Sequence, residues 1–180
     1  MKIIDTEIPE VKIIQPKIFG DHRGYFAETY REDIFKKEIG NINFVQDNES
    51  SSLYGVLRGL HSQKDGYAQA KLVRVIVGEV LDVAVDIRPN SPTFKQHVAA
   101  VLSEKNKHQM YVPRGFAHGF VVLSDYAVFS YKCDNYYYPD QEMGIKYNDP
   151  ELAIDWRIPS EDIKLSEKDK KNYNFSEIKW

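Results

Sequence analysis

The sequence predicts a mainly β protein of the sandwich or barrel type. Residues 80–88 (VLDVAVDIR) alternate between two kinds of side chain, as a strand with two different faces does. Residues 71–77 (KLVRVIV) form a second run rich in β-branched residues. Further short runs separated by turn-type residues predict strands at 97–102, 108–113, 118–124 and 127–132.

The pair of runs at 71–77 and 80–88 carries two more expectations. Gly78-Glu79 lies between them and predicts a tight hairpin turn. In the second run Leu81, Val83, Val85 and Ile87 share one face, and Asp82 lies on the other. If that other face lines a barrel, Asp82 is a buried acid that needs a partner.

Helix signals are few and short. Thr29 and Glu32 have the spacing of a capping box before Ile34 and Phe35, and a second short helix is expected after Ser166. Repeats and a convincing linker are missing, so residues 1–180 are expected to form one domain.

Composition excludes several function classes. The net charge is -3 and the Lys and Arg residues are scattered, so we expect no nucleic-acid partner. No run of 18 apolar residues occurs, and charges interrupt the first dozen residues, so we expect no membrane partner and no export. A single cysteine, Cys133, excludes an intrachain disulfide and a multi-thiolate zinc site and fits the cytoplasm.

Two of the five histidines lie in patterned places, His61 in VLRGLHSQ and His118 in PRGFAHGF. The spacing PxGxxH that ends at His118 resembles the second motif of cupin barrels, where the histidine is in most members a metal ligand. The companion motif requires HxH, but Ser62 and Gln63 follow His61 here, which leaves too few ligands. We therefore expect an organic acid–base site without a bound metal.

The chain as a whole resembles the dTDP-4-dehydrorhamnose 3,5-epimerase family. Eight segments carry the resemblance in the family's order from Phe19 to Asp169: GDHRGYFAETY, VQDNESSS, GVLRGLH, AQAKLVRVIVGEVLDVAVDIRPNSPTF, VPRGFAHGF, FSYKCDNYY, NDPELAIDW and LSEKD. The resemblance implies a cupin-like jelly-roll β-barrel with short flanking helices. It also implies a homodimer and a place in dTDP-rhamnose and polysaccharide biosynthesis.

The implied reaction inverts C3 and C5 of a dTDP-4-keto-6-deoxyhexose, a small nucleotide-sugar substrate. Both carbons are α to the C4 carbonyl, so removal of either proton gives an enolate. That chemistry needs a base, an electrophile near O4 and a proton donor across the ring. It demands no redox cofactor and no metal, so the expected cofactor is none.

By match to the family's motifs, His61 is the base, Lys71 stabilises the enolate and Tyr131 returns the proton. Asp169 matches the carboxylate that orients the base. Ser166 and Asp169 also have capping-box spacing, so the sequence leaves open whether Asp169 orients His61 or only caps a helix.

The resemblance further implies contacts to the substrate. Arg23 and Arg58 match the arginines that bind the diphosphate. Tyr137 is expected under the thymine ring, although its tyrosine neighbours allow a slip of one residue. Asp82 is expected to line the site without an assigned role. The remaining expected contacts are Phe26, Glu28, Gln46, Asn48, His118, Glu142 and Lys168.

Other functions remain open at the level of sequence. Ser62 stands where the family usually has a bulky residue next to the base, so the preferred sugar is less certain than the reaction class. A relative that inverts only C3 or only C5, or that acts on a different nucleotide-linked 4-keto sugar, fits the same residues. A metal-dependent cupin isomerase or dioxygenase and a catalytically silent sugar-nucleotide binder are the alternatives from other classes.

Overall fold

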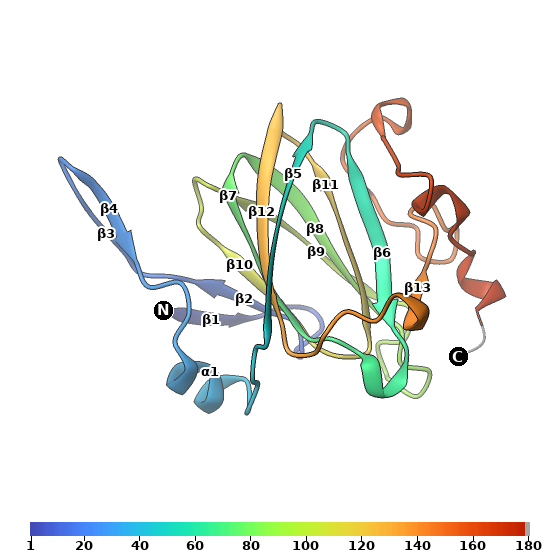
Figure 1. The fold of residues 1–180 in the computed structure, drawn as a ribbon, viewed down its shortest axis with the longest axis horizontal. Helices are drawn as coiled ribbons and strands as arrows, with labels where there is room; N and C mark the ends of the chain where they lie inside the picture. The colour runs from blue at the N-terminus through green and yellow to red at the C-terminus, as the bar shows by residue number, and fades with distance from the viewer. Residues whose placement is uncertain (179–180) are drawn as a thin grey trace.

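Two antiparallel sheets face each other and form most of the molecule (Figure 1). A computed structural model describes residues 1–178, apart from the side chain of Asp65. The prediction of a mainly β jelly roll is confirmed, and the two sheets remain separate rather than closing into one continuous barrel. Within the described residues, no helix is long and apolar enough to cross a membrane.

The strands divide between these sheets and a separate hairpin. The larger sheet has, in spatial order, β1 (Lys2–Asp5), β2 (Lys12–Gln15), β10 (Gln109–Val112), β7 (Lys71–Val77), β12 (Tyr126–Cys133) and β5 (Gln46–Leu53). The smaller has β13 (Glu142–Gly144), β6 (Leu57–Gln63), β11 (Phe116–Val122), β8 (Glu79–Asp86) and β9 (His97–Ser103). The hairpin of β3 (Ile18–Asp21) and β4 (Gly24–Ala27) projects away from both (Figure 1).

Helical segments are short, as the sequence predicts. Residues 1–178 contain one α-helix, α1 (Glu32–Glu38). The other helical segments of the described residues are single 3-10 turns: η1 (Asp65–Tyr67), η2 (Pro139–Gln141), η3 (Ser160–Asp162), η4 (Asp169–Lys171) and η5 (Phe175–Glu177).

The expected capping box at Thr29 is wrong. Helix α1 begins at Glu32 after Arg31, which makes no side-chain capping bond. The carbonyl of Thr29 instead accepts a hydrogen bond of 2.7 Å from Gln109 Nε2 on β10, so Thr29 is held by the sheet. The second expected helix is only the turn η4. Ser166 precedes this turn, and its Oγ accepts a bond of 3.0 Å from the Asp169 amide.

The expected hairpin at Gly78-Glu79 is also wrong, because β7 and β8 belong to different sheets. Strand β7 pairs with β10 and β12, whereas β8 pairs with β9 and β11. Gly78 has a φ of 80°, and a Cβ there would lie 2.1 Å from the carbonyl oxygen of Tyr126. The chain therefore passes from one sheet to the other where only glycine fits.

Strand β8 separates two apolar layers, which confirms its two different faces. Val80 and Ala84 pack between the sheets with Phe116, Phe120 and Phe129. The opposite face, including Leu81 and Val83, packs under residues 145–178, called here the C-terminal segment. This segment lies beside β6 in Figure 1. Burying both faces fixes the strand register firmly, because a slip of one residue would exchange the two layers.

Candidate active site

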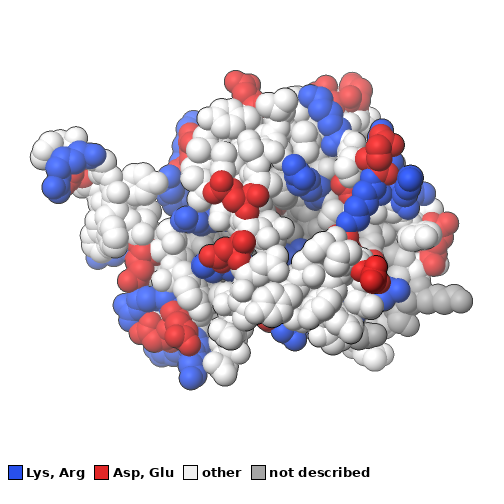
Figure 2. All heavy atoms as spheres, viewed as in Figure 1, with Lys and Arg blue, Asp and Glu red and all other residues white. Residues whose placement is uncertain are grey.

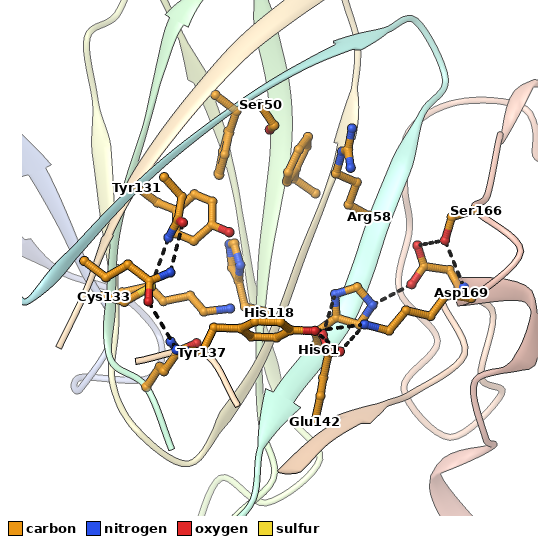
Figure 3. A pocket seen from close by; sticks show the side chains of 17 residues that line it. Ser50, Arg58, His61, His118, Tyr131, Cys133, Tyr137, Glu142, Ser166 and Asp169 are labelled. Carbon is orange, nitrogen blue, oxygen red and sulfur yellow. Dashed lines mark hydrogen bonds and ion pairs between the residues drawn. The ribbon is translucent and has the colours of Figure 1, made fainter. Parts of the chain in front are cut away.

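A cavity of about 400 Å³ opens between the two sheets (Figure 3). Both sheets and the C-terminal segment line it, so residues far apart in sequence meet there. It brings together eleven of the expected residues: Gln46, Asn48, Arg58, His61, Lys71, His118, Tyr131, Tyr137, Glu142, Lys168 and Asp169.

His61 on β6 forms a short hydrogen bond with Asp169 at the rim of the cavity. The distance from His61 Nε2 to Asp169 Oδ1 is 2.5 Å, and the two side chains are 25% and 5% exposed. Ser166 Oγ donates a bond of 2.8 Å to the other carboxylate oxygen. Asp169 thus contacts both His61 and Ser166, so the two roles that the sequence leaves open are compatible in space.

The charge of Asp169 is stabilised by these contacts. Burial alone would raise the pKa of the Asp169 carboxyl, but the hydrogen bond and the charge of His61, with help from Ser166 and Lys168, hold it below its usual value. With Nε2 engaged, the other ring nitrogen of His61, Nδ1, lies 3.8 Å from Glu142 Oε1. A histidine fixed in this way by a carboxylate has one nitrogen left for proton exchange.

Lys71 and Tyr131 lie on neighbouring strands of the opposite sheet. The Lys71 ammonium is 5.9 Å from the centre of the Tyr131 ring. Burial lowers the pKa of Lys71, against the raising effects of Cys133, Asp82 and Glu142. Burial also raises the pKa of Tyr131, so its hydroxyl keeps its proton at neutral pH.

A second histidine–carboxylate pair lies deeper, on β11 and β8. His118 Nε2 is 3.0 Å from both carboxylate oxygens of Asp82, and the side chains are only 8% and 0% exposed. Asp82 does not itself line the cavity, but His118 does. The buried acid therefore has the partner that its burial requires.

The mouth of the cavity carries a hydrogen-bonded group of three side chains. Tyr137 donates a bond of 2.9 Å from its hydroxyl to Glu142 Oε2, and Lys168 pairs with the same oxygen. Tyr137, and neither of its tyrosine neighbours, lines the cavity. Arg58 is held near the opening by a bond of 3.1 Å from its Nε to Ser52 Oγ. Figure 2 shows positive and negative side chains interspersed over this face.

Besides Asp82, three more expected residues lie outside the cavity of this chain. Arg23, Phe26 and Glu28 belong to or follow the projecting hairpin. Arg23 pairs with Asp21, and Phe26 is 67% exposed. A single chain does not bring these three side chains to the other site residues.

Sequence reasoning missed several lining residues: Ser50, Gln69, Phe120, Phe129, Cys133 and Ser166. Alternation could have found some of them. On β5, Gln46, Asn48 and Ser50 point the same way, and Phe129, Tyr131 and Cys133 do so on β12. No pattern in the sequence marks Gln69.

No metal-binding group is visible in the part of the chain that the structure describes, since it has no cluster of three His, Cys, Asp or Glu side chains placed to hold an ion. His118 Nε2 lies 3.0 Å from the carboxylate of Asp82. The arrangement of an oriented histidine, a half-buried lysine and a protonated tyrosine around one cavity suits acid–base chemistry.

The fold is that of a jelly-roll protein, and the residues around its cavity suit acid–base chemistry on a small molecule. Residues 5–177 match the model of the dTDP-4-dehydrorhamnose 3,5-epimerase family. A dTDP-4-dehydrorhamnose 3,5-epimerase of Shigella flexneri is 54% identical over 94% of this chain and 93% of its own. The chain therefore belongs to the dTDP-4-dehydrorhamnose 3,5-epimerase family.

Solved structures agree with this assignment. The dTDP-4-dehydrorhamnose 3,5-epimerase of Elizabethkingia anophelis has a TM-score of 0.94 and 54% identity, covering 98% of this chain and 97% of that one. The dTDP-6-deoxy-D-glucose-3,5-epimerase of Legionella pneumophila, in complex with dTDP-4-keto-L-rhamnose, has a TM-score of 0.95 and 51% identity, covering 99% and 94%.

Proposed function

We propose that the protein converts dTDP-4-dehydro-6-deoxyglucose to dTDP-4-dehydrorhamnose by inverting C3 and C5. The observation that carries the proposal is the meeting of the His61–Asp169 pair, Lys71 and Tyr131 around one cavity. Membership of the family and the ligand of the Legionella relative support the substrate class.

In the proposed mechanism, His61 removes the proton next to the C4 ketone. Asp169 holds the imidazole and stabilises its protonated form. The positive charge of Lys71 stabilises the enolate oxygen, an interaction that is strong because the site is poor in water. Tyr131 then donates its proton to the opposite face of the ring.

The rest of the cavity binds the nucleotide part in this proposal. Arg58 and Lys168 supply positive charge for the diphosphate at the opening. Tyr137 offers a flat surface for the thymine ring. Polar contacts to the substrate come from Gln46, Asn48, His118 and Glu142.

We propose further that the protein is a single-domain cytoplasmic enzyme that works as a homodimer and supplies dTDP-rhamnose for polysaccharide synthesis. The hairpin of one subunit would reach the partner's cavity and lend it Arg23, Phe26 and Glu28. Its exposed aromatic side chains, Phe19, Tyr25 and Phe26, favour such a contact, because apolar surface of this kind is stabilised when it is covered.

The reaction is tested by NMR of dTDP-4-keto-6-deoxyglucose incubated with the protein in deuterium oxide. We expect deuterium at both C3 and C5 together with inversion of both centres. Label at one carbon would replace the proposal by the mono-epimerase alternative. Binding of the substrate without any label would favour the silent binder.

The shared site is tested by mixing two inactive variants, His61→Ala and Arg23→Ala. A mixed dimer has one cavity with its own His61 and the partner's Arg23, so we expect activity to return after subunit exchange. Light scattering should give the mass of a dimer at micromolar concentration. A monomer mass, or no recovery from dimers that have exchanged subunits, would refute the shared site.

A further inference from the structure

Arg58 and His61 line the same cavity although they are three residues apart on one strand. In a regular strand, side chains at odd separations point to opposite faces. Leu57 and Leu60, also three apart, both pack on the other side of β6, in the layer under the C-terminal segment. The alternation of β6 must therefore change between Arg58 and His61.

A β-bulge produces this change. On the neighbouring strand β11, His118 pairs with His61 and Phe120 pairs with Arg58. Gly59 and Leu60 together therefore face the single residue Gly119. The extra residue in β6 reverses the alternation, so that Arg58 and His61 turn toward the same side.

The two glycines allow the backbones to touch at the bulge. Gly59 has a φ of 131°, and a Cβ there would lie 2.5 Å from the Cα of Gly119. A Cβ on Gly119 would lie 2.8 Å from the carbonyl oxygen of Arg58. Both distances are too short for a side chain, so the bulge requires glycine on both strands.

Asn172 joins the bulge to the turn that carries Asp169. Its side-chain Nδ2 lies 3.2 Å from the Gly59 carbonyl oxygen and 3.4 Å from that of Ile145. Its backbone amide donates a bond of 3.2 Å to the carbonyl of Asp169. Asn172 is 8% exposed, and its side chain packs against Gly144, where a Cβ would lie 2.0 Å from Asn172 Oδ1.

We propose that Asn172 is a positioning residue, whose amide holds the turn that carries Asp169 against the bulge that aims Arg58 and His61 into the cavity. Asn172 does not line this cavity. It lines an adjoining hollow, which shares His61, Tyr137, Glu142 and Lys168 with the cavity. It acts through Asp169, which needs a fixed place to meet His61 Nε2 at 2.5 Å. This inference rests on the proposed epimerase function for its kinetic test.

The kinetic test compares Asn172→Ala with Asp169→Asn and with the double variant. We expect Asn172→Ala to lower kcat for deuterium exchange roughly 10- to 100-fold, as loss of a residue that orients a ligating or catalytic group often does. KM and the affinity for dTDP should change less than about twofold. The double variant should be no slower than Asp169→Asn alone, because both changes remove the same alignment.

Asn174→Ala is the matched control. Asn174 lies two residues further on and caps the next turn, η5, so its loss removes a local contact of the C-terminal segment without touching the bulge. Exchange by this variant should match that of the unchanged protein. Gly119→Ala should instead impair dTDP binding and exchange together, because it disturbs Arg58 and His61 at once.

A readout without substrate separates this inference from the proposed function. The proton in the short His61–Asp169 bond should give a strongly downfield NMR signal in the unliganded protein, and Asn172→Ala should remove it while Asn174→Ala keeps it. An unchanged signal in Asn172→Ala would show that Asn172 only stabilises the fold. The same conclusion would follow if the loss of exchange rate in the double variant equalled the product of the losses in the two single variants. A protein with the signal and no exchange activity would refute the proposed function alone.

Discussion

Two histidines on adjoining strands of one sheet each pair with a carboxylate, and the two pairs differ in what surrounds them. His61 and His118 are direct partners in the β6–β11 register. The rim pair, His61–Asp169, keeps a quarter of the imidazole side chain exposed, and the turn η4 near the C-terminus supplies its carboxylate. The floor pair, His118–Asp82, is enclosed on two strands of the smaller sheet, and its carboxylate is fully buried.

The difference indicates which pair can exchange protons with a ligand. The rim imidazole has one nitrogen bound by Asp169 and the other near the cavity, so it can be protonated and released in turn. In the floor pair, both oxygens of Asp82 lie 3.0 Å from one nitrogen of His118, and the Asp82 side chain is fully buried. A buried pair of this kind fixes structure, and breaking it leaves a charge without a partner.

Removal of the rim histidine should have the largest effect on catalysis. We expect His61→Ala to lower the rate of product formation by ~10² or more, because a positioned general base contributes typically that much. The measurement is the initial rate of inversion, followed by chromatography of the products. Near-normal inversion by this variant would show that another residue is the base.

Removal of the floor histidine should have the largest effect on stability. We expect His118→Ala to lower the free energy of unfolding by about 3–5 kcal/mol, since Asp82 would remain buried and unpaired. Asp169→Asn at the rim should lower it by only about 1 kcal/mol, the usual size of one hydrogen bond. Urea unfolding of both variants measures the two values, and the reverse order would contradict the comparison.

Tyr131→Phe should separate proton exchange at the substrate carbon from inversion of that carbon. Without the phenolic proton, His61 can still form the enolate and return deuterium to the original face. The variant should therefore still exchange deuterium, whereas we expect its rate of inversion to fall by ~10². Parallel assays of label and product test this, and equal losses of both would remove Tyr131 from its proposed role.

The pH at which activity falls on the alkaline side, called the alkaline limb, should depend on Asp82 of the floor pair, because Asp82 affects the pKa of Lys71. Because burial lowers the pKa of Lys71 below 10.5, its charge, and with it the rate, should be lost as the pH rises through that lowered value. Asp82 raises this pKa, so Asp82→Asn should move the limb to lower pH. Asp169→Asn should leave the limb in place, which makes it the control in a profile of rate against pH.

Chelation should have the smallest effect of all. We expect EDTA to leave activity unchanged, because His118 Nε2 bonds to Asp82 and Lys71 can serve as the electrophile. Loss of turnover that a divalent ion restores would show that the floor histidine binds a metal, and the comparison between the two pairs would then fail.

The sequence predicts much of the surroundings of the floor pair and less of those of the rim pair. Alternation in 80–88 placed Asp82 on the inner face of β8, because a strand buried on both sides must keep a period of two. The same rule does not hold on β6, for which the sequence predicts no strand, because a bulge reverses the alternation between Arg58 and His61. Spacing alone also failed at Gly78, since a tight turn and a passage between sheets both use glycine.

The C-terminal part of the site was hidden for a different reason. Asp169 was recognisable by resemblance, and Asn172 was not, because its contacts with Gly59 and Ile145 join segments far apart in sequence. The placement of Arg23, Phe26 and Glu28 outside the cavity likewise depends on how the hairpin leaves the sheets, which no local pattern encodes. Both the contacts of Asn172 and the position of the hairpin depend on tertiary structure.

The most direct test of the account compares deuterium incorporation by His61→Asn and His118→Asn under the same conditions. Each variant replaces one imidazole with an amide that can still make a hydrogen bond to its carboxylate. The account predicts that His61→Asn incorporates no label at C3 or C5, and that His118→Asn still labels both carbons at a reduced rate. Label from His61→Asn and none from His118→Asn would show that the floor pair, and not the rim pair, removes the proton.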